Sequence, residues 1–258
     1  MKSQYYDVIF RRKSFHLFRN VGTDCISADE LAAIEQAYAA FEPLDAGIRT
    51  ALRIVPAGQV QFKRGAEYCL LLYSEEKGDY LRNIGYMGEQ LDLYLVAHRI
   101  GSLWFGIGKP DEPTYEGLSY VIMIAIHKVN DDAKFRRDMY KSKRKPLSEI
   151  WSGDDPGFAD ITRFAPSACN TQPWFVESDS HTLTVFRYKK PGKRGIMPAA
   201  AVSYYNRIDM GIYLCFLEIC MEHSGLAFTK ELYPDDGGDR ELTKTAVYTL
   251  KKAVKAHE

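Results

Sequence analysis

The segment RFAPSACNTQPWFVE (163–177) sets the architecture expected around it. Pro166 and Pro173 keep the segment extended and stiff, because a proline ring fixes φ at about −65°. Trp174 can anchor it in a hydrophobic core, since an indole ring buries a large apolar surface. The flanking sequence predicts a helix that ends before Pro166 and a strand near residues 174–178. We therefore expect a rigid loop between a helix and a strand.

The same segment carries polar side chains of a particular kind. Ser167, Asn170 and Gln172 present hydroxyl and amide groups at close spacing. Such groups can satisfy the carbonyl and imide edge of a planar heterocycle, because amides both donate and accept hydrogen bonds. The alternative is a plain proline-bounded loop, and the chemistry of these residues alone favours that alternative.

Helices and strands are expected on both sides of this loop. The clearest helix start is a capping box formed by Ser27 and Glu30, and that helix ends before Pro43. The turn PDDGGD (234–239) separates the last two strands. Further helices are expected at 5–13, 87–101 and 208–225, and strands at 67–75, 119–129, 183–189, 227–232 and 245–252.

Two segments far apart in the chain resemble each other. Residues 83–101 and 207–225 align without gaps, and both are apolar on more than one face, which suits helices at the centre of a structure. Segment 51–61 precedes the first of them as 162–172 precedes the second, and strands follow both. Any two buried helices look somewhat alike. Three similar features in the same order nevertheless favour a duplication, with periods typical of repeated domains.

The charged stretch 131–146 is the expected boundary between the two repeats, because domain boundaries fall in polar, exposed linkers. This boundary divides the chain into a first half, 1–145, and a second half, 146–258.

Composition excludes several classes of protein. Thirty-four Lys and Arg balance 34 Asp and Glu, so no global field attracts nucleic acid or a membrane surface. No apolar run reaches the roughly 20 residues that span a bilayer, and the first residues lack the features of a secretory signal. We therefore expect a cytoplasmic protein. The five cysteines show no CxxC spacing, and His and Cys never cluster as zinc ligands, so neither a disulfide framework nor a metal site is expected.

Four motifs, in order along the chain, resemble those of the FMN-dependent nitroreductase family. APSACNTQPW (165–174) closely matches the long signature APSxxNxQPW. RRKSFHLF (11–18) resembles RRSVRxF, with His16 in place of the usual arginine. HRIGSLWFGIG (98–108) is similar to LGLGSxWxGG, and SKRKPLSEI (142–150) to the tail motif kkRxPLeel. The resemblance extends from about residue 5 to residue 225.

The tail motif normally ends a nitroreductase, yet here another half follows. This order favours the single-chain branch of the family, which is built from two nitroreductase-like halves. The resemblance implies an α+β fold, with helices packed on mixed sheets around two central apolar helices. Ordinary nitroreductases are homodimers with FMN in the interface, so this chain is expected to form a pseudo-dimer by itself, and a monomer is compatible with that.

The resemblance also implies a phosphate site. Arg12 would supply a charge-assisted fork and Ser14 a hydroxyl, with Lys13 and His16 nearby, and Arg144 would close the same anion site. Taken alone, RRK is also typical of a helix end that complements the helix dipole, KSKRK of a solvated linker and His16 of a surface residue. For His16 and Arg144 these alternatives stay open.

The flavin ring would lie against the signature loop. Main chain near Trp104 and Gly106 would approach the reactive flavin nitrogen, where a glycine lets backbone come close. Contacts to the flavin edge would come from Pro166, Ser167, Ala168, Asn170 and Gln172.

The two halves are expected to differ in their sites. The counterpart of PSACN in the first half is PAGQV, with Val60 in place of Asn170, and the second half has no RRxS element. One site therefore looks complete and its counterpart eroded.

The resemblance implies an FMN-dependent oxidoreductase. NADH or NADPH would reduce the flavin, and a nitroaromatic, quinone or similar small acceptor would then be reduced in a ping-pong scheme that requires no catalytic side chain. One alternative is a catalytically weak flavin-binding protein of the same fold. Another is a nucleic-acid or partner-binding module that uses RRK and KSKRK, against which net neutrality and the lack of interleaved aromatic residues count.

Overall fold

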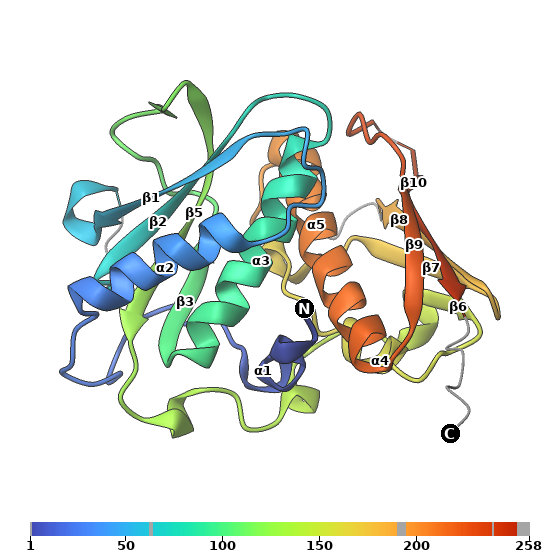
Figure 1. Ribbon diagram of the computed structural model, residues 1–258, viewed down its shortest axis with the longest axis horizontal. Coiled ribbons are helices and arrows are strands. Elements are labelled where there is room, and N and C mark those ends of the chain that lie inside the picture. The colour runs from blue at the N-terminus through green and yellow to red at the C-terminus, as the bar shows by residue number, and fades with distance from the viewer. Residues whose placement is uncertain (1, 62–63, 190–194, 239, 252–258) are drawn as a thin grey trace.

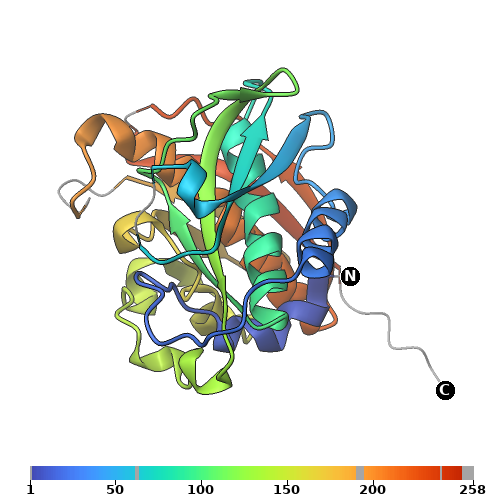
Figure 2. The same cartoon turned by 90° about the vertical axis from the view of Figure 1, so that its left-hand side faces the viewer.

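Two long helices lie side by side between two β-sheets (Figure 1). The computed structural model describes residues 2–61, 64–189, 195–238 and 240–251 of the 258-residue chain. The central helices are α3 (Tyr80–Ala97) and α5 (Ala199–His223), and most of their residues are buried. Figure 2 shows the same α+β arrangement from the side of the first sheet. Within these described ranges, no helix is long and apolar enough to cross a membrane.

The first sheet has the strand order β1-β2-β5-β3, with every neighbouring pair antiparallel and β4 added beside β5. The predicted capping box is present, because the Ser27 hydroxyl accepts from the Glu30 N–H at 3.2 Å and the Glu30 carboxylate accepts from the Ser27 N–H at 2.9 Å. The elements of this part are α1 (Tyr6–Arg11), α2 (Ala28–Ala40), β1 (Thr50–Pro56), β2 (Tyr68–Ser74), β3 (Ile100–Phe105), β4 (Thr114–Tyr115) and β5 (Leu118–Lys128).

The second sheet repeats this order. Its strands run β6-β7-β8-β10-β9, and without β6 the antiparallel path β7-β8-β10-β9 has the same topology as β1-β2-β5-β3. Strand β6 pairs with β7 in parallel. The elements are β6 (Trp151–Gly153), α4 (Ala159–Thr162), β7 (Trp174–Ser178), β8 (Thr182–Tyr188), β9 (Ala227–Leu232) and β10 (Leu242–Lys251).

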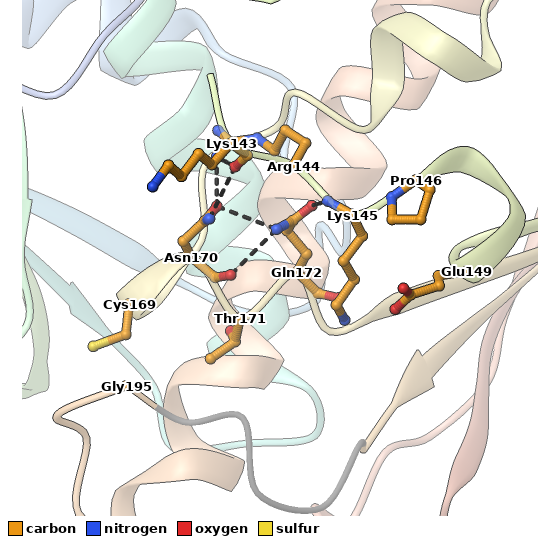
Figure 3. A pocket seen from close by; sticks show the side chains of 10 residues that line it. All are labelled: Lys143, Arg144, Lys145, Pro146, Glu149, Cys169, Asn170, Thr171, Gln172 and Gly195. Carbon is orange, nitrogen blue, oxygen red and sulfur yellow. Dashed lines mark hydrogen bonds between the residues drawn. The ribbon is translucent and has the colours of Figure 1, made fainter. Parts of the chain in front are cut away.

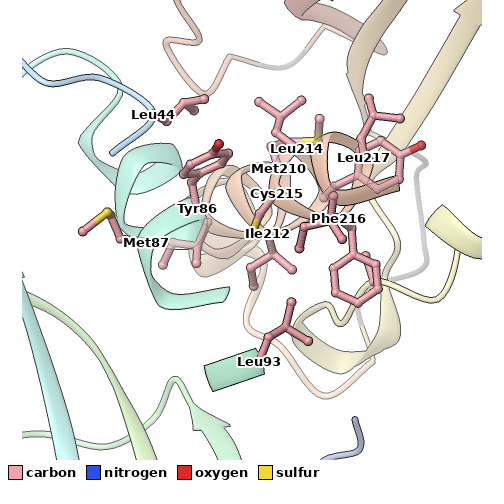
Figure 4. Close-up of a cluster of buried hydrophobic side chains, with 14 of the residues drawn as sticks. Leu44, Tyr86, Met87, Leu93, Met210, Ile212, Leu214, Cys215, Phe216 and Leu217 are labelled. Carbon is pink, nitrogen blue, oxygen red and sulfur yellow. The ribbon is translucent and has the colours of Figure 1, made fainter. Parts of the chain in front are cut away.

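The central helices approach each other closely enough to require glycine. A Cβ atom on Gly85 would lie 1.9 Å from the carbonyl oxygen of Ile208, and one on Gly211 would lie 1.9 Å from the carbonyl oxygen of Arg82. A single shift of 126 positions relates Gly85 to Gly211 and also Arg82 to Ile208. The helices therefore cross about a local two-fold relationship, and apolar side chains such as Leu93 surround the crossing (Figure 4).

Both central helices differ in length from the prediction. Helix α3 begins at Tyr80, before residue 87, and ends at Ala97, so Gly101 lies inside strand β3. The helix ends early because Arg99 adopts a left-handed φ of 60°, which an α-helix cannot contain. Helix α5 begins directly after Pro198, nine residues before the expected start at Ile208.

The expected equivalence of segments 51–61 and 162–172 is wrong. Residues 51–56 belong to strand β1 and are followed by a 3-10 turn, whereas 162–172 precede strand β7. The segment in the equivalent position, before β1, is 41–49, so Val60 is not the counterpart of Asn170. The predicted helix alignment is also two positions out, because 83–101 and 207–225 differ by 124. Apolar periodicity cannot fix a register when nearly every side chain is buried.

Candidate active site

The signature loop holds a strained backbone. Cys169, Asn170 and Gln172 have φ values of 50°, 55° and 48°, in the left-handed region that favours glycine. Each such residue costs on the order of 1–3 kcal/mol and persists only where surrounding contacts enforce it. Here the Ala168 N–H donates to Asp209 Oδ1 on α5 at 2.9 Å, and the Gln172 N–H donates to Ser167 Oγ at 3.0 Å. The loop is therefore built to hold one shape.

Residues 143–145 clamp this loop from outside (Figure 3). Arg144 donates to the Asn170 side-chain oxygen and, at 3.2 Å, to the Phe164 carbonyl, while Asn170 Nδ2 donates to the Lys143 carbonyl at 3.0 Å. The Lys145 N–H donates to Gln172 Oε1 at 2.8 Å. The tail motif and the signature loop thus meet through Arg144 and Asn170, which the sequence analysis had assigned to the phosphate site and to the flavin edge.

The clamp engages the amides that were predicted to touch a flavin edge. The Gln172 side chain is only 2% exposed, and its Nε2 donates back to the Asn170 carbonyl at 3.2 Å, so it shapes the loop from inside. Pro166 is buried as well, whereas Asn170 is exposed at the rim of a cavity of about 520 Å³. This cavity is lined by Lys143, Arg144, Lys145, Pro146, Glu149, Cys169, Asn170, Thr171, Gln172 and Gly195.

Four arginines gather beside the clamp. Burial, followed by repulsion from Arg12, lowers the pKa of Arg136 to about 10. Burial lowers the pKa of Arg144 to about 10 as well, with further contributions from Arg12, Arg136 and Arg163. Arg163 has a carboxylate partner, Asp160, at 2.6 Å. In the described parts of the chain, no carboxylate pairs with Arg136 or Arg144, so this corner carries uncompensated positive charge.

Arg12 is held by a buried carboxylate. Asp92 on α3 is fully buried, and its Oδ2 accepts from Arg12 Nε at 2.9 Å and from Trp104 Nε1 at 3.0 Å, while Oδ1 accepts from Ser102 Oγ. The backbones of Ser14 and Ser102 form an isolated parallel β-bridge. Asp92 therefore links the RRKS and GSLW motifs. Its buried carboxylate is paired and hydrogen-bonded, as a buried charge requires. The Arg12 side chain is 3% exposed, and most of its guanidinium group is already paired with Asp92.

The other predicted residues are placed differently. Lys13 is half-buried, with its Nζ 4.7 Å from the Phe15 ring centre, and burial together with Lys134 and Arg136 lowers its pKa. It therefore belongs to the basic corner. His16 is exposed, and its backbone carbonyl accepts a hydrogen bond from Arg64 at 3.5 Å.

The space beside Gly106 is filled by a side chain that the sequence did not reveal. The Tyr205 hydroxyl donates to the Gly106 carbonyl at 2.6 Å, and a Cβ on Gly106 would lie 2.5 Å from the Tyr205 ring. The glycine thus admits a tyrosine of α5, where the prediction had a flavin. The motifs also missed Asp92 and Arg136. An acidic residue inside an apolar helix was a usable signal for Asp92.

Comparisons with known proteins identify the family and support the fold. The family described as "Putative TM nitroreductase" matches residues 4–221. A putative nitroreductase from Thermotoga maritima has a similar structure, with a TM-score of 0.58 and 17% identity over 95% of this chain and 92% of that one. At this identity the likeness shows the fold alone. The comparison with curated proteins finds no match.

Shorter solved proteins match part of the chain. A putative nitroreductase from Desulfovibrio desulfuricans, solved in complex with FMN, has a TM-score of 0.40 and 16% identity over 56% of this chain and 93% of its own. A nitroreductase from Desulfitobacterium hafniense with bound FMN has a TM-score of 0.38 and 15% identity over 57% and 99%. Each of these proteins is matched almost entirely by little more than half of this chain.

Proposed function

Because the chain belongs to the nitroreductase family that matches residues 4–221, we propose that it is an FMN-dependent oxidoreductase with one flavin site between its two halves. The observation that carries this proposal is the basic corner of Arg12, Arg136, Arg144 and Arg163, which adjoins the strained signature loop. Uncompensated arginines beside a rigid loop favour a bound phosphate, because guanidinium groups bind phosphate through paired, charge-assisted hydrogen bonds.

The residues fit FMN in two respects. The Arg144 Nε atom is buried without a hydrogen-bond partner, and Arg136 has no carboxylate partner in the described ranges, so both have capacity for phosphate oxygens. The second respect is the fixed position of the loop around Ser167 and Ala168, which is held against α5 because the Ala168 N–H donates to Asp209. Lys13 and Ser14 would complete the phosphate site from the first half, with Arg12 acting chiefly as a fixed positive charge.

Bound FMN would accept a hydride from NADH or NADPH and pass reducing equivalents to a nitroaromatic, a quinone or a similar small acceptor. The protein would bind and orient the reactants through its fixed dipoles and charges. Asp92 would act as a positioning residue, since it holds Arg12, Ser102 and Trp104 in place. We assign no side chain as a proton donor.

We further propose that the two halves arose by duplication and together replace the two subunits of an ordinary nitroreductase. The matching strand orders, the paired glycines Gly85 and Gly211, and the equivalent loop contacts support this proposal. The Asp45 N–H donates to Asn83 Oδ1 at 3.0 Å, as the Ala168 N–H donates to Asp209 Oδ1 at 2.9 Å. The same shift of 126 positions relates Asn83 to Asp209.

A second candidate is a flavin-binding protein with little turnover. The observation that favours it is the Tyr205 ring packed on Gly106, at the place where the reactive part of a flavin was expected. In this case FMN would bind through the arginine corner, but NAD(P)H would not reduce it readily.

One experiment separates these outcomes. Purified protein is reconstituted with FMN, the flavin-to-protein ratio is measured after gel filtration, and NADH or NADPH is added without oxygen. The enzyme proposal predicts about one FMN per chain and rapid bleaching of the flavin absorbance. Binding without bleaching supports the second candidate, and no binding at high micromolar FMN contradicts both.

A further inference from the structure

A second cavity lies beside α3, at the position equivalent to the space around Gly106, Tyr205 and Asp209 beside α5. It has a volume of about 440 Å³ and lies where the 44–45 loop, the start of α3 and the end of β9 meet. The Asp45–Asn83 hydrogen bond, which is the counterpart of the Ala168–Asp209 bond, forms one wall. Its lining residues are Leu44, Asp45, Gly78, Asp79, Arg82, Asn83, Leu232, Tyr233, Pro234, Asp235 and Asp236.

This cavity is open because small residues replace large ones. The shift of 126 positions places Gly78 and Asp79 at the positions of Tyr204 and Tyr205. At the equivalent place beside α5 the Tyr205 ring packs onto Gly106, whereas a Cβ on Gly78 would meet nothing closer than 3.9 Å. The cavity therefore lies in the space equivalent to the one that the Tyr205 ring fills beside α5.

An unsatisfied donor lines this cavity. Asn83 is 1% exposed, its Oδ1 accepts from Asp45, and its Nδ2 has no hydrogen-bond partner. A buried donor without a partner costs about 1–3 kcal/mol, so its presence calls for an explanation. A ligand with an acceptor atom would remove that cost.

The charges around the cavity disfavour phosphate. Asp79 pairs with Arg82 at 2.7 Å, and Asp235 pairs with Arg187 at 2.6 Å, so these four charges cancel in place. Two carboxylates, Asp45 and Asp236, remain at the rim, and Arg240 lies 3.6 Å from Asp236 with its side chain 72% exposed.

Burial raises the pKa of Asp79, and this effect exceeds the opposite effect of its partner Arg82. The Asp235 charge raises the pKa and the more distant cation Arg207 lowers it, both by smaller amounts. The Arg207 Nε is buried without a partner beside Gly237. The pocket therefore has two ion pairs inside, the cation Arg207 beside it and two carboxylates at its mouth, which suits a ligand with both hydrogen-bond acceptors and donors.

We propose that this cavity is a second binding site, for a small planar heterocycle without phosphate. A ring nitrogen or carbonyl of the ligand accepts from Asn83 Nδ2, N–H groups face Asp45 and Asp236, and the apolar residues Leu44, Leu232 and Pro234 contact the ring. The site is separate from the proposed flavin site, and it rests on the local geometry whether or not FMN binds to the other half.

The test uses lumichrome, a flavin ring without ribityl phosphate, as the probe. Equilibrium dialysis is carried out on full-length protein saturated with FMN, so that the first site is blocked, and amide hydrogen exchange maps the bound probe. We expect saturable binding and slower exchange at 44–49 and 232–236. Binding that protects residues 143–145 and 168–172 overturns the proposal, as does no binding at the solubility limit of lumichrome.

Asn83→Asp is the discriminating variant. It keeps the oxygen that accepts from Asp45, reproduces the residue that stands at 209, and replaces the orphan donor with an acceptor. We expect at least a tenfold loss of lumichrome affinity with unchanged FMN affinity. The rim variant Asp236→Asn checks the result if Asn83→Asp lowers stability, and it should weaken lumichrome binding severalfold. Unchanged lumichrome affinity in both variants contradicts the assignment.

Discussion

The two cavities differ in their surroundings and in their charge. One lies beside four arginines and the signature loop, and the other is rimmed by the carboxylates of Asp45 and Asp236. In each half, a loop N–H donates to a central helix, to Asn83 in one half and to Asp209 in the other. The comparison shows that this backbone contact is common to both halves, while the charged side chains around the two cavities differ.

The central helices carry a second matched pair. Asp92 accepts from Arg12, Ser102 and Trp104, whereas Glu218, 126 positions later, accepts from Tyr86 at 2.5 Å, Tyr248 at 2.8 Å and Lys230 at 3.0 Å. Lys230 stands at the position equivalent to Trp104. Asp92 and Glu218 are therefore both buried and both accept several hydrogen bonds, but only the Asp92 network includes an arginine of the basic corner.

The largest effect is expected where the halves touch. Gly85→Ala and Gly211→Ala should each destabilise the protein by more than about 3 kcal/mol, because each Cβ would lie 1.9 Å from a carbonyl oxygen of the other helix. Urea unfolding monitored by circular dichroism measures both. Gly58→Ala is the control, since its Cβ would meet nothing within 4 Å. A large effect at one glycine and none at the other would break the two-fold relationship.

A smaller effect is expected from the basic corner. Arg136→Ala should weaken FMN binding about ten- to one-hundredfold, the equivalent of roughly 1.5–3 kcal/mol for a charge-assisted hydrogen bond. The unliganded protein should be at least as stable as the wild type, because the change removes a repulsion felt by Arg144. Fluorescence titration and thermal unfolding measure the two quantities.

Arg240→Ala, at the rim of the other cavity, is the matched control and should leave FMN affinity unchanged. Equal losses at the two positions would show that FMN responds to general surface charge. Arg12→Ala is a poorer test, since it also leaves the buried Asp92 carboxylate without its cation.

A further, pH-dependent effect concerns the residues that hold the two loops. Burial raises the pKa of Asp209 to about 8, from an ordinary value of 3.8. The folded protein therefore retains a proton that the unfolded chain has lost, so this contribution to stability is complete below about pH 4. It decreases by up to about 1.4 kcal/mol per pH unit until about pH 8.

Asp209→Asn makes position 209 match Asn83 and removes this titration while keeping the acceptor for Ala168. Denaturation midpoints between pH 4 and pH 8 should fall more steeply for the wild type than for the variant. Parallel pH profiles would show that Asp209 stays ionised in the fold.

The sequence predicted the local structure of the motifs better than the tertiary contacts that the motifs make. Long, specific patterns such as APSACNTQPW and the Ser27–Glu30 capping box predicted local structure correctly, because their residue types act on their own backbone. The register between the helices could not be predicted, since it depends on backbone contact at Gly85 and Gly211. The Arg136 charge and the Tyr205 ring reach the site through tertiary packing, which a linear pattern does not contain.

The most direct test of the central claim is a crystal structure of the FMN complex. The account predicts one FMN per chain, with its phosphate on Arg136 and Arg144 and its ring near Ala168 and Gly106, all from the same chain. It also predicts that Tyr205 moves from Gly106 or stacks on the ring. FMN in the cavity beside Asn83, or a site in which RRKS and PSACN come from different chains, would contradict it.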